Sequence, residues 1–351
     1  MSEEAIKSKT YSASAEIPET EKEILPVLEL SENEKPIIRE KKKIPWVKRI
    51  VNIPNFLFIL IWAASFLPSR YDTEMRQGLH DFKAFGVVLI IIEIIFMIRN
   101  GIEKEHQSQK DIIGFLYGFF LLWEFFVSRM NALPYVFIPA PENVFYIFKE
   151  DTANIAAGFR SSMFLIIVGV ASALFCAVVL GTLVGWVPRL TKAVYPIVKA
   201  ISTVPALIYT PYVVLIMPTF RTASLFVVFL SIFWGSFMGS INNTAFVEKK
   251  VINSAKVLNM KTFPMLFKVI IPFNMPRIIN NLPINLATAL MTLTAAEMIG
   301  AESGMGYYVR VALNYANYTK AIAGIIFIGI VVTSLNIIIG LLKKKFVTWD
   351  Y

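Results

Sequence analysis

The sequence predicts an all-α protein, a polytopic bundle of membrane-spanning helices, and three observations lead to this fold class. Of its 351 residues, 56% are hydrophobic and 17% are charged, whereas soluble domains carry about 25% charged residues. Apolar runs approach the length needed to cross a bilayer, about 20 residues, several times along the chain. Basic residues gather between these runs, which is a distribution that reports membrane topology.

Eight apolar stretches are candidate spans. They cover residues 51–68, 84–98, 112–130, 161–187, 194–217, 222–242, 278–298 and 320–342. The second stretch is short and contains Glu93, so it is also compatible with a tilted or interfacial helix. We expect no cleaved signal peptide, because the first apolar stretch begins too late for one.

The distribution of Lys and Arg predicts the orientation of the spans. With the N-terminus inside, 24 of the 34 Lys and Arg residues fall in cytoplasmic segments, nine fall in external ones, and Lys199 lies within the fifth span. Without the N-terminal segment the bias is still 14 to nine. We therefore expect a multi-pass protein of the plasma (inner) membrane with both termini in the cytoplasm.

Residues 1–49 are expected to form a disordered cytoplasmic tail. They hold ten basic and ten acidic residues and few large apolar ones, too little apolar surface to bury in a core. The basic cluster at the end of this tail would hold it near anionic headgroups, and a specific binding role stays open.

Residues 243–277 interrupt the apolar chain with a polar, basic, amphipathic segment. Apolar side chains recur at helical spacing on both sides of Asn259, which predicts two short helices joined by a sharp turn. Asn259 suits a left-handed position just past the first helix. Thr262 suits the N-cap of the second helix, with Pro264 in its first turn.

Pro272 and Pro276 are expected to stop this second helix before the next span. The segment would then present its surface to the cytoplasm. Its pattern alone fits a basic loop lying in the lipid headgroups as well as a surface that contacts a cytoplasmic partner.

The fifth span contains Pro205 and Pro211 within one apolar run. Proline removes a backbone hydrogen bond and kinks a helix, and in a membrane the freed groups need a neighbouring helix or a water-filled cavity. This favours a helix that lines a pathway over a purely structural kink. Tyr209, Thr210 and Tyr212 would be the polar groups available there.

The seventh span ends in a segment that contains Glu297 and three glycines. Gly300, Gly304 and Gly306 mark a loop with unusual backbone angles or close approach. An ionisable residue at the membrane boundary is a functional candidate, whereas a helix-end carboxylate held by local hydrogen bonds is the structural alternative. Thr292 and Thr294 of the same span are further pathway candidates.

Four segments share a pattern with one family of membrane proteins. They are LWEFF (122–126), IPAPENVF (138–145), VPALIYTPYVVL (204–215) and AEMIGAESGMGYYV (296–309). In this order they resemble the ABC importer permeases for nitrate, sulfonate, taurine and bicarbonate, and Trp349 also fits. Two departures are Met305, where the family pattern has Leu, and MPTFRTA (217–223), where it has a Phe-Gly-x-Gly turn.

The segment 243–277 resembles the ATPase-docking loop of the same permeases. Asn253-Ser254-Ala255 stands at the family's Glu-Ala-Ala run, Asn259 at its Gly, and Val269-Ile270-Ile271-Pro272 at its Ile-x-Leu-Pro ending; only Ala255 and Pro272 match strictly. The resemblance implies a docking role for Asn253, Ala255, Lys256, Leu258, Asn259, Met260, Phe263 and Pro272.

The resemblance covers roughly residues 112–351 and implies a six-span permease core preceded by an additional hairpin, residues 50–111, of no readable function. It implies a homodimer, a cytoplasmic ABC ATPase, an external substrate-binding protein and a small anionic solute such as nitrate, a sulfonate or taurine. A thiamine-precursor pyrimidine or a similar nutrient remains an alternative. The pathway would be lined by Pro205, Tyr209, Thr210, Thr292, Thr294 and Glu297.

We do not expect this chain to catalyse a reaction itself. It has no GxxxxGK[ST] phosphate loop, so ATP and Mg are expected on the partner ATPase, and no HExxH, CxxC or GxSxG motif. We therefore expect no catalytic residue, metal site or cofactor, and no nucleic-acid partner, because the basic residues report topology.

Two other function classes remain as alternatives. An ion-coupled secondary transporter or channel would need no ATPase, but it would usually show more ionisable groups at the membrane midplane than Glu93, Glu124 and Glu297. Glu124 is expected to anchor a helix. An intramembrane enzyme would need a cluster of acids and histidines that the sequence does not provide.

Overall fold

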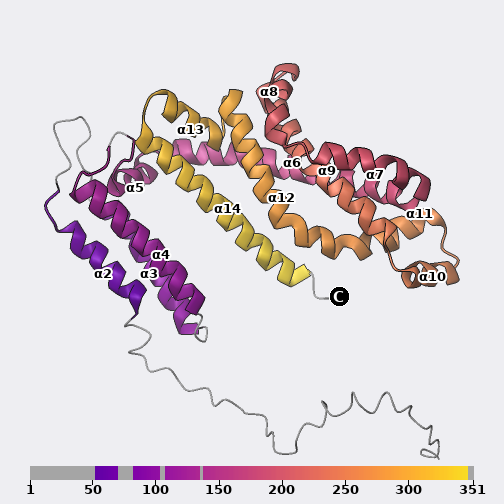
Figure 1. The fold of residues 1–351 in the computed structure, drawn as a ribbon, viewed down its shortest axis with the longest axis horizontal. Coiled ribbons are helices and arrows are strands. Elements are labelled where there is room, and N and C mark those ends of the chain that lie inside the picture. Colours follow the sequence, from indigo (N-terminus) through magenta and orange to yellow (C-terminus); the bar gives the residue numbers. More distant parts are fainter. Residues whose placement is uncertain (1–51, 70–81, 103–106, 135–136, 347–351) are drawn as a thin grey trace, which may run out of the picture. The chain divides into compact units, whose positions relative to one another are not determined.

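The computed structural model describes residues 52–69, 82–102, 107–134 and 137–346, and all regular elements in these ranges are helical (Figure 1). The predicted tail 1–49 and Trp349 lie outside the described residues. In chain order the helices are α2 (Ile53–Ser65), α3 (Lys83–Ile102), α4 (Gln107–Trp123), the π-helical η4 (Glu124–Arg129), α5 (Pro141–Glu150), α6 (Thr152–Trp186), α7 (Pro188–Ser202), α8 (Ala206–Ile216), α9 (Phe220–Ala245), α10 (Lys249–Val257), α11 (Thr262–Met265), the π-helical η5 (Leu266–Ile270), α12 (Ile271–Gly300), α13 (Met305–Asn314) and α14 (Tyr318–Phe346).

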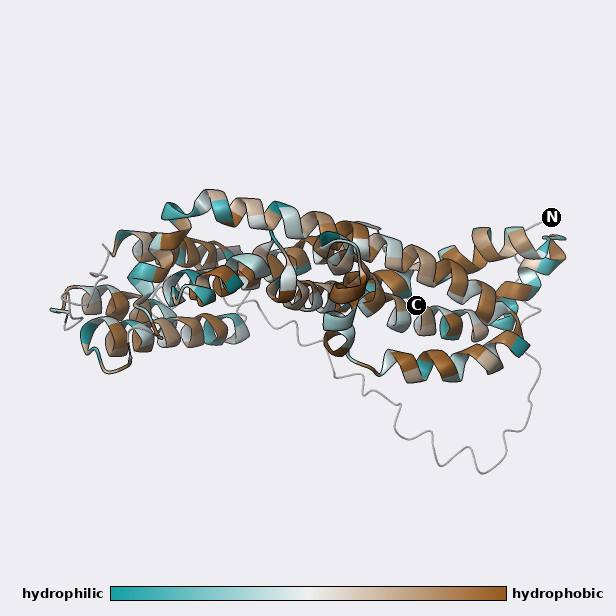
Figure 2. Ribbon diagram, turned by 90° about the horizontal axis from the view of Figure 1, so that it is seen from above, coloured by the Kyte–Doolittle hydropathy of each residue, from teal (hydrophilic) through white to brown (hydrophobic). Residues whose placement is uncertain are grey.

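Within the described ranges, five helices are long and apolar enough to cross a membrane, and the bent pair α7–α8 makes a sixth if it is one span. Figure 2 shows apolar residues along most of the length of these helices. They correspond to the six predicted spans from 112–130 onward. The predicted span 51–68 corresponds to α2, which has only 13 residues. The predicted span 84–98 extends to the 20 residues of α3.

Helices α6 and α9 approach each other along a stripe of small residues. Small side chains recur every fourth position on the buried face of α6: Gly169, Ala173, Ala177, Gly181 and Gly185. A Cβ on Gly181 would lie 2.5 Å from the Cβ of Ser240, and one on Gly185 would lie 2.6 Å from the carbonyl oxygen of Ile241. Small residues therefore let the two backbones come close, as is common between membrane helices.

A buried apolar core joins four of the spans. Ile166 of α6, Val228 of α9, Leu290 of α12 and Val331 of α14 belong to this one cluster. Because hydrocarbon tails are as apolar as these side chains, dispersion contacts and close fit hold such a core together.

The N-terminal helices α2 and α3 pack with α4 and α5 around a cluster of aromatic side chains. Phe85 of α3 stacks on Phe145 of α5, with ring centroids 5.2 Å apart, and the hydroxyl of Tyr117 donates to Glu93 Oε2 at 2.9 Å. The amphipathic helix predicted to begin near Pro141 is α5, and its apolar face is buried. The additional hairpin thus contacts α5.

The fifth predicted span, 194–217, is not a single kinked helix. Helix α7 ends at Ser202, α8 begins at Ala206, and the two are bent by 90°. Pro205 is the residue before α8, where a missing N–H breaks no helical bond, and its ring disfavours helical angles at Val204. One proline therefore ends α7 and starts α8, while Pro211 lies inside α8.

The prediction that Pro272 and Pro276 stop a helix is wrong, because the helical run continues from Thr262 to Gly300. Pro272 follows the π-helical turn η5 directly and lies in the first turn of α12, where its missing N–H is tolerated. Pro276 lies inside α12, which membrane helices tolerate when neighbours meet the freed carbonyl. Lys261, and not Thr262, is the N-cap of α11.

Candidate functional site

The two ends of the spans carry different elements. Helices α5 and α13 lie at one end, where the Tyr308 hydroxyl donates to Asp151 Oδ2 at 2.9 Å. Helices α10 and α11 follow α9 and lie at the other end (Figure 1). We call these the α13 end and the α10 end.

At the α10 end, α10 closes with a sharp turn at Asn259. The Asn259 φ is 52°, its N–H donates to the Lys256 carbonyl at 2.9 Å, and the Met260 N–H donates to the Ala255 carbonyl at 3.2 Å. This hydrogen bonding around a left-handed residue is a common helix terminator. The prediction of a left-handed Asn259 is confirmed.

Large apolar side chains are exposed around this turn. Val257, Leu258, Phe263 and Phe267 are 82%, 74%, 66% and 37% exposed, and the rings of Phe263 and Phe267 lie 4.9 Å apart. We call these four residues the apolar docking patch. Exposed apolar surface of this kind fits contact with a protein partner as well as with lipid headgroups.

Two of the residues predicted to dock an ATPase, Leu258 and Phe263, belong to this patch, and the others come from the same segment of the chain. Asn253, Lys256, Leu258, Asn259, Phe263 and Pro272 are exposed, Met260 is half-buried and Ala255 is buried. Val257 and Phe267 are also exposed in the patch and were not among the predicted residues, although their position close to Leu258 and Phe263 was a signal available in the sequence. Ala255 lies under the surface and positions α10.

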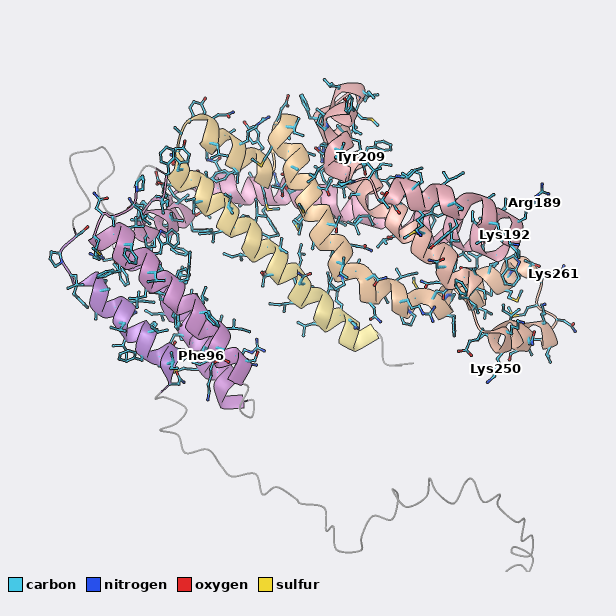
Figure 3. All side chains as sticks on the ribbon, in the orientation of Figure 1. Phe96, Arg189, Lys192, Tyr209, Lys250 and Lys261 are labelled. Atoms are coloured by element: carbon cyan, nitrogen blue, oxygen red, sulfur yellow. The ribbon has the colours of Figure 1, made fainter. Side chains whose placement is uncertain are left out.

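The opposite face of this segment packs on the ends of two spans. Val247, Leu266 and Ile270 form a buried cluster with Trp186 and Leu183 of α6, and η5 continues into α12. A displacement of the docking segment would therefore move both α6 and α12. In Figure 3 the labelled basic residues Arg189, Lys192, Lys250 and Lys261 also lie at this end.

A cavity of about 270 Å³ lies between α6, α9 and α12. Two of its walls carry uncharged polar side chains: Ser236, Ser240 and Asn243 of α9, and Asn281 and Asn285 of α12. The third wall, from α6, consists of Leu174 and Val178. We call this the polar cavity.

The polar cavity lies in the halves of α9 and α12 that are nearer the α10 end. A Cβ placed on Gly235 or Gly239, which also line it, would meet no described atom within 4 Å. Asn281 is exposed and Asn285 is half-buried. The glycines of α9 thus open space beside amide groups that lie within the membrane-spanning helices.

The residues predicted to line a pathway lie elsewhere, on α8 and on the half of α12 nearer the α13 end. Thr210 and Thr292 are buried. The hydroxyls of Thr210, Thr292 and Thr294 donate to the carbonyls four residues earlier in their own helices. Tyr209 is half-buried on α8 (Figure 3), and Pro205 precedes that helix. The polar cavity has none of these residues in its lining.

Glu297 is 1% exposed and joins α12 to α6 and α13. Ser162 Oγ donates to Glu297 Oε1 at 2.7 Å, and the Gly306 N–H donates to Glu297 Oε2 at 2.8 Å. Gly304 has a φ of 122°, and a Cβ there would collide with the Glu297 carboxylate. Glu297 therefore holds the glycine loop, as in the structural alternative raised from the sequence.

Three more carboxylates at the α13 end are paired with basic side chains. Burial alone would raise the pKa of Asp151, but hydrogen bonds from Lys320, Asn154 and Tyr308 outweigh it and lower that pKa. Arg129 donates to buried Glu124 and Glu142, and burial together with the Glu124 carboxylate raises the pKa of Glu142 to about 8. Glu124 thus anchors η4 to α5, as predicted.

Comparison with known proteins gives these features a context. Residues 173–348 match the family described as binding-protein-dependent transport system inner membrane component. The matched part includes the polar cavity and the docking patch.

Several curated relatives match over most of their length. The putative aliphatic sulfonates transport permease protein SsuC of Bacillus subtilis is 24% identical over 65% of this chain and 83% of its own. The taurine transport system permease protein TauC of Escherichia coli is 26% identical over 68% and 88%. The nitrate import permease protein NrtB of Leptolyngbya laminosa is 26% identical over 53% and 67%.

Proposed function

The chain belongs to the family of binding-protein-dependent transport system inner membrane components, and from this premise we propose how it works within an ABC importer. It is a multi-pass membrane permease for small anions, in keeping with its sulfonate, taurine and nitrate relatives. We propose that the solute carried by this chain is a sulfonate, taurine or nitrate. It acts with an external substrate-binding protein and with a cytoplasmic ATPase that carries ATP and Mg.

The observation that carries this proposal is the apolar docking patch, on a segment whose opposite face packs on α6 and which leads into α12. An exposed apolar surface at the turn between α10 and α11 fits a protein partner, and we assign the ATPase to it. The α10 end is then cytoplasmic, in agreement with the basic residues gathered there and with the positive-inside rule. We assign both termini to the cytoplasm as well, because the basic residues near each end of the chain favour that side.

The coupling follows from how the docking segment is attached. When the ATPase pair closes around ATP, it pushes on α10 and η5, which pack on Trp186 and lead into α12. Helices α6 and α12 form walls of the polar cavity. Their movement therefore opens the cavity alternately toward the two sides of the membrane. Two copies of the chain form a homodimer with the pathway between them.

The test is purification of the full chain from its native membrane, with identification of the proteins that accompany it. We expect an ABC ATPase in roughly equal amount. Leu258→Glu, which puts a charge into the docking patch, should remove most of the ATPase. Tyr315→Glu, at an equally exposed aromatic residue at the α13 end, should leave it bound.

Retention of the ATPase by the Leu258→Glu chain would show that the docking assignment is wrong. A chain that purifies without any ATPase and still transports a solute along an ion gradient would overturn the importer proposal as a whole.

A further inference from the structure

We propose that the polar cavity is a contact site for the transported oxyanion, which Ser236, Asn281 and Asn285 bind through uncharged hydrogen-bond donors. The proposal rests on the proposed function of the chain and names the chemistry by which that function selects its solute. None of the three residues was predicted from the sequence.

The first argument is the position of the amides. Asn281 and Asn285 are one turn apart on α12, in a helical run long and apolar enough to cross a membrane. Asn281 is nevertheless exposed. Lipid offers no hydrogen-bond partner, and an unsatisfied polar group costs several kcal/mol there. These side chains therefore face water, a solute or another protein surface.

The second argument is unused hydrogen-bonding capacity. Three asparagines and two serines line the polar cavity, and their only mutual hydrogen bond is long, from Asn285 Nδ2 to Ser236 Oγ at 3.5 Å. Within the described residues, no side chain or backbone group pairs with the amide of Asn281 or of Asn243. Each amide can donate two hydrogen bonds, and each hydroxyl one.

The third argument is charge. The lining contains no Lys, Arg, Asp or Glu, so a solute held here meets dipoles and no fixed charge. An anion that leaves water needs donors to replace its hydration, and a pathway also needs binding weak enough for release. Amide and hydroxyl groups supply the donors that replace hydration, and they attract the anion less strongly than a buried cation would.

The fourth argument is shape. At about 270 Å³ the polar cavity is close to the lower limit of small-molecule sites, about 300 Å³. Gly235 and Gly239 leave open space on the α9 wall, so a solute can approach the hydroxyls of Ser236 and Ser240 closely. The apolar wall from α6 would face the organic part of a sulfonate.

The experiment measures how charged thiol reagents reach this site in membrane vesicles that contain the full complex. The single native cysteine, Cys176, is first replaced by serine. Asn281→Cys is then compared with Asn280→Cys, a neighbouring exposed asparagine that does not line the polar cavity. Each chain is treated with an anionic sulfonatoethyl and a cationic trimethylammonioethyl methanethiosulfonate.

We expect the anionic reagent to modify the Asn281→Cys chain faster than the cationic one. The ratio of the two rates should exceed that of the Asn280→Cys chain by about tenfold, equivalent to about 1.4 kcal/mol. Nitrate or ethanesulfonate should slow the reaction of the Asn281→Cys chain and not of the Asn280→Cys chain. Choline chloride of equal ionic strength is the control for screening.

Two results would overturn the inference. One is an Asn281→Cys chain that does not react, because a partner surface then covers the position. The other is equal preference at both positions without protection by either anion. The same vesicles are assayed for bound ATPase. If the ATPase is bound but either overturning result is found, the inference about the polar cavity is wrong and the proposed function stands. If no ATPase is bound, the proposed function itself is refuted.

Discussion

Buried polar residues carry much of the specificity of this fold at the scale of single residues. Glu297 is an acceptor for two donors from other segments, Ser162 Oγ and the Gly306 N–H. The Ser162 hydroxyl oxygen in turn accepts from the Met305 N–H at 2.8 Å. A buried donor without a partner is costly, so this one carboxylate fixes how α13 lies against α6.

Glu297→Ala should lower the melting temperature of the detergent-solubilised chain. It leaves two buried donors unpaired, at about 1–3 kcal/mol each. Glu302→Ala, at an exposed carboxylate in the loop that follows, should change the stability by no more than about 0.5 kcal/mol. Equal melting temperatures for the two variants would contradict the role assigned to Glu297.

The pairing of α6 with α9 is the central contact at the scale of elements. The small residues spaced four apart on α6 allow the approach, and the close contacts fall on Ser240 and Ile241 of α9. Ser240 also lines the polar cavity. The same packing that holds the two spans together therefore sets the width of the cavity.

Gly181→Ala should destabilise the protein by about 1–3 kcal/mol, since an added Cβ would overpack the α6–α9 contact. Gly329→Ala on α14 is the matched control. A Cβ there meets no described atom within 4 Å, and Ala is the better helix former by up to about 1 kcal/mol. The measurement is thermal unfolding of both variants. A Gly181→Ala chain as stable as the control would show that the α6 and α9 backbones are not in close contact.

At the scale of the whole unit, helices α6 and α12 connect the docking patch with the polar cavity. Trp186 of α6 packs on the docking segment, and α12 continues from η5. Both helices form walls of the polar cavity. An ATPase that moves the docking segment, as proposed, is therefore expected to change the polar cavity as well.

Trapping the ATPase with ATP, Mg and vanadate should change the rate at which the Asn281→Cys chain is modified. Typical coupling free energies correspond to a change of about 5- to 150-fold relative to the ADP-bound complex. The measurement is the modification rate in vesicles that contain the bound ATPase. An identical rate in the two nucleotide states would contradict coupling between the docking patch and the polar cavity.

The sequence by itself determined the helical membrane class, the family and the sharp turn at Asn259. These depend on properties that are local in the chain: hydrophobic runs, the positions of charges, and short motifs around Asn259 and Glu297. The left-handed Asn259 was predictable because few non-glycine residues tolerate that backbone conformation. The small-residue repeat of α6 was equally local and was overlooked.

The tertiary structure alone decided how the prolines act and which polar residues share a space. Pro272 does not end a helix because the π-helical turn before it places the proline in the first turn of α12. Rules based on residue propensity do not predict a π-helical turn. Ser236 and Asn285 are 49 positions apart, so only the packing of α9 on α12 brings them together. The same packing decides the environment of Thr292 and Thr294, whose hydroxyls donate to carbonyls of their own helix, as threonines in a span often do. Their place in a pathway stays a prediction.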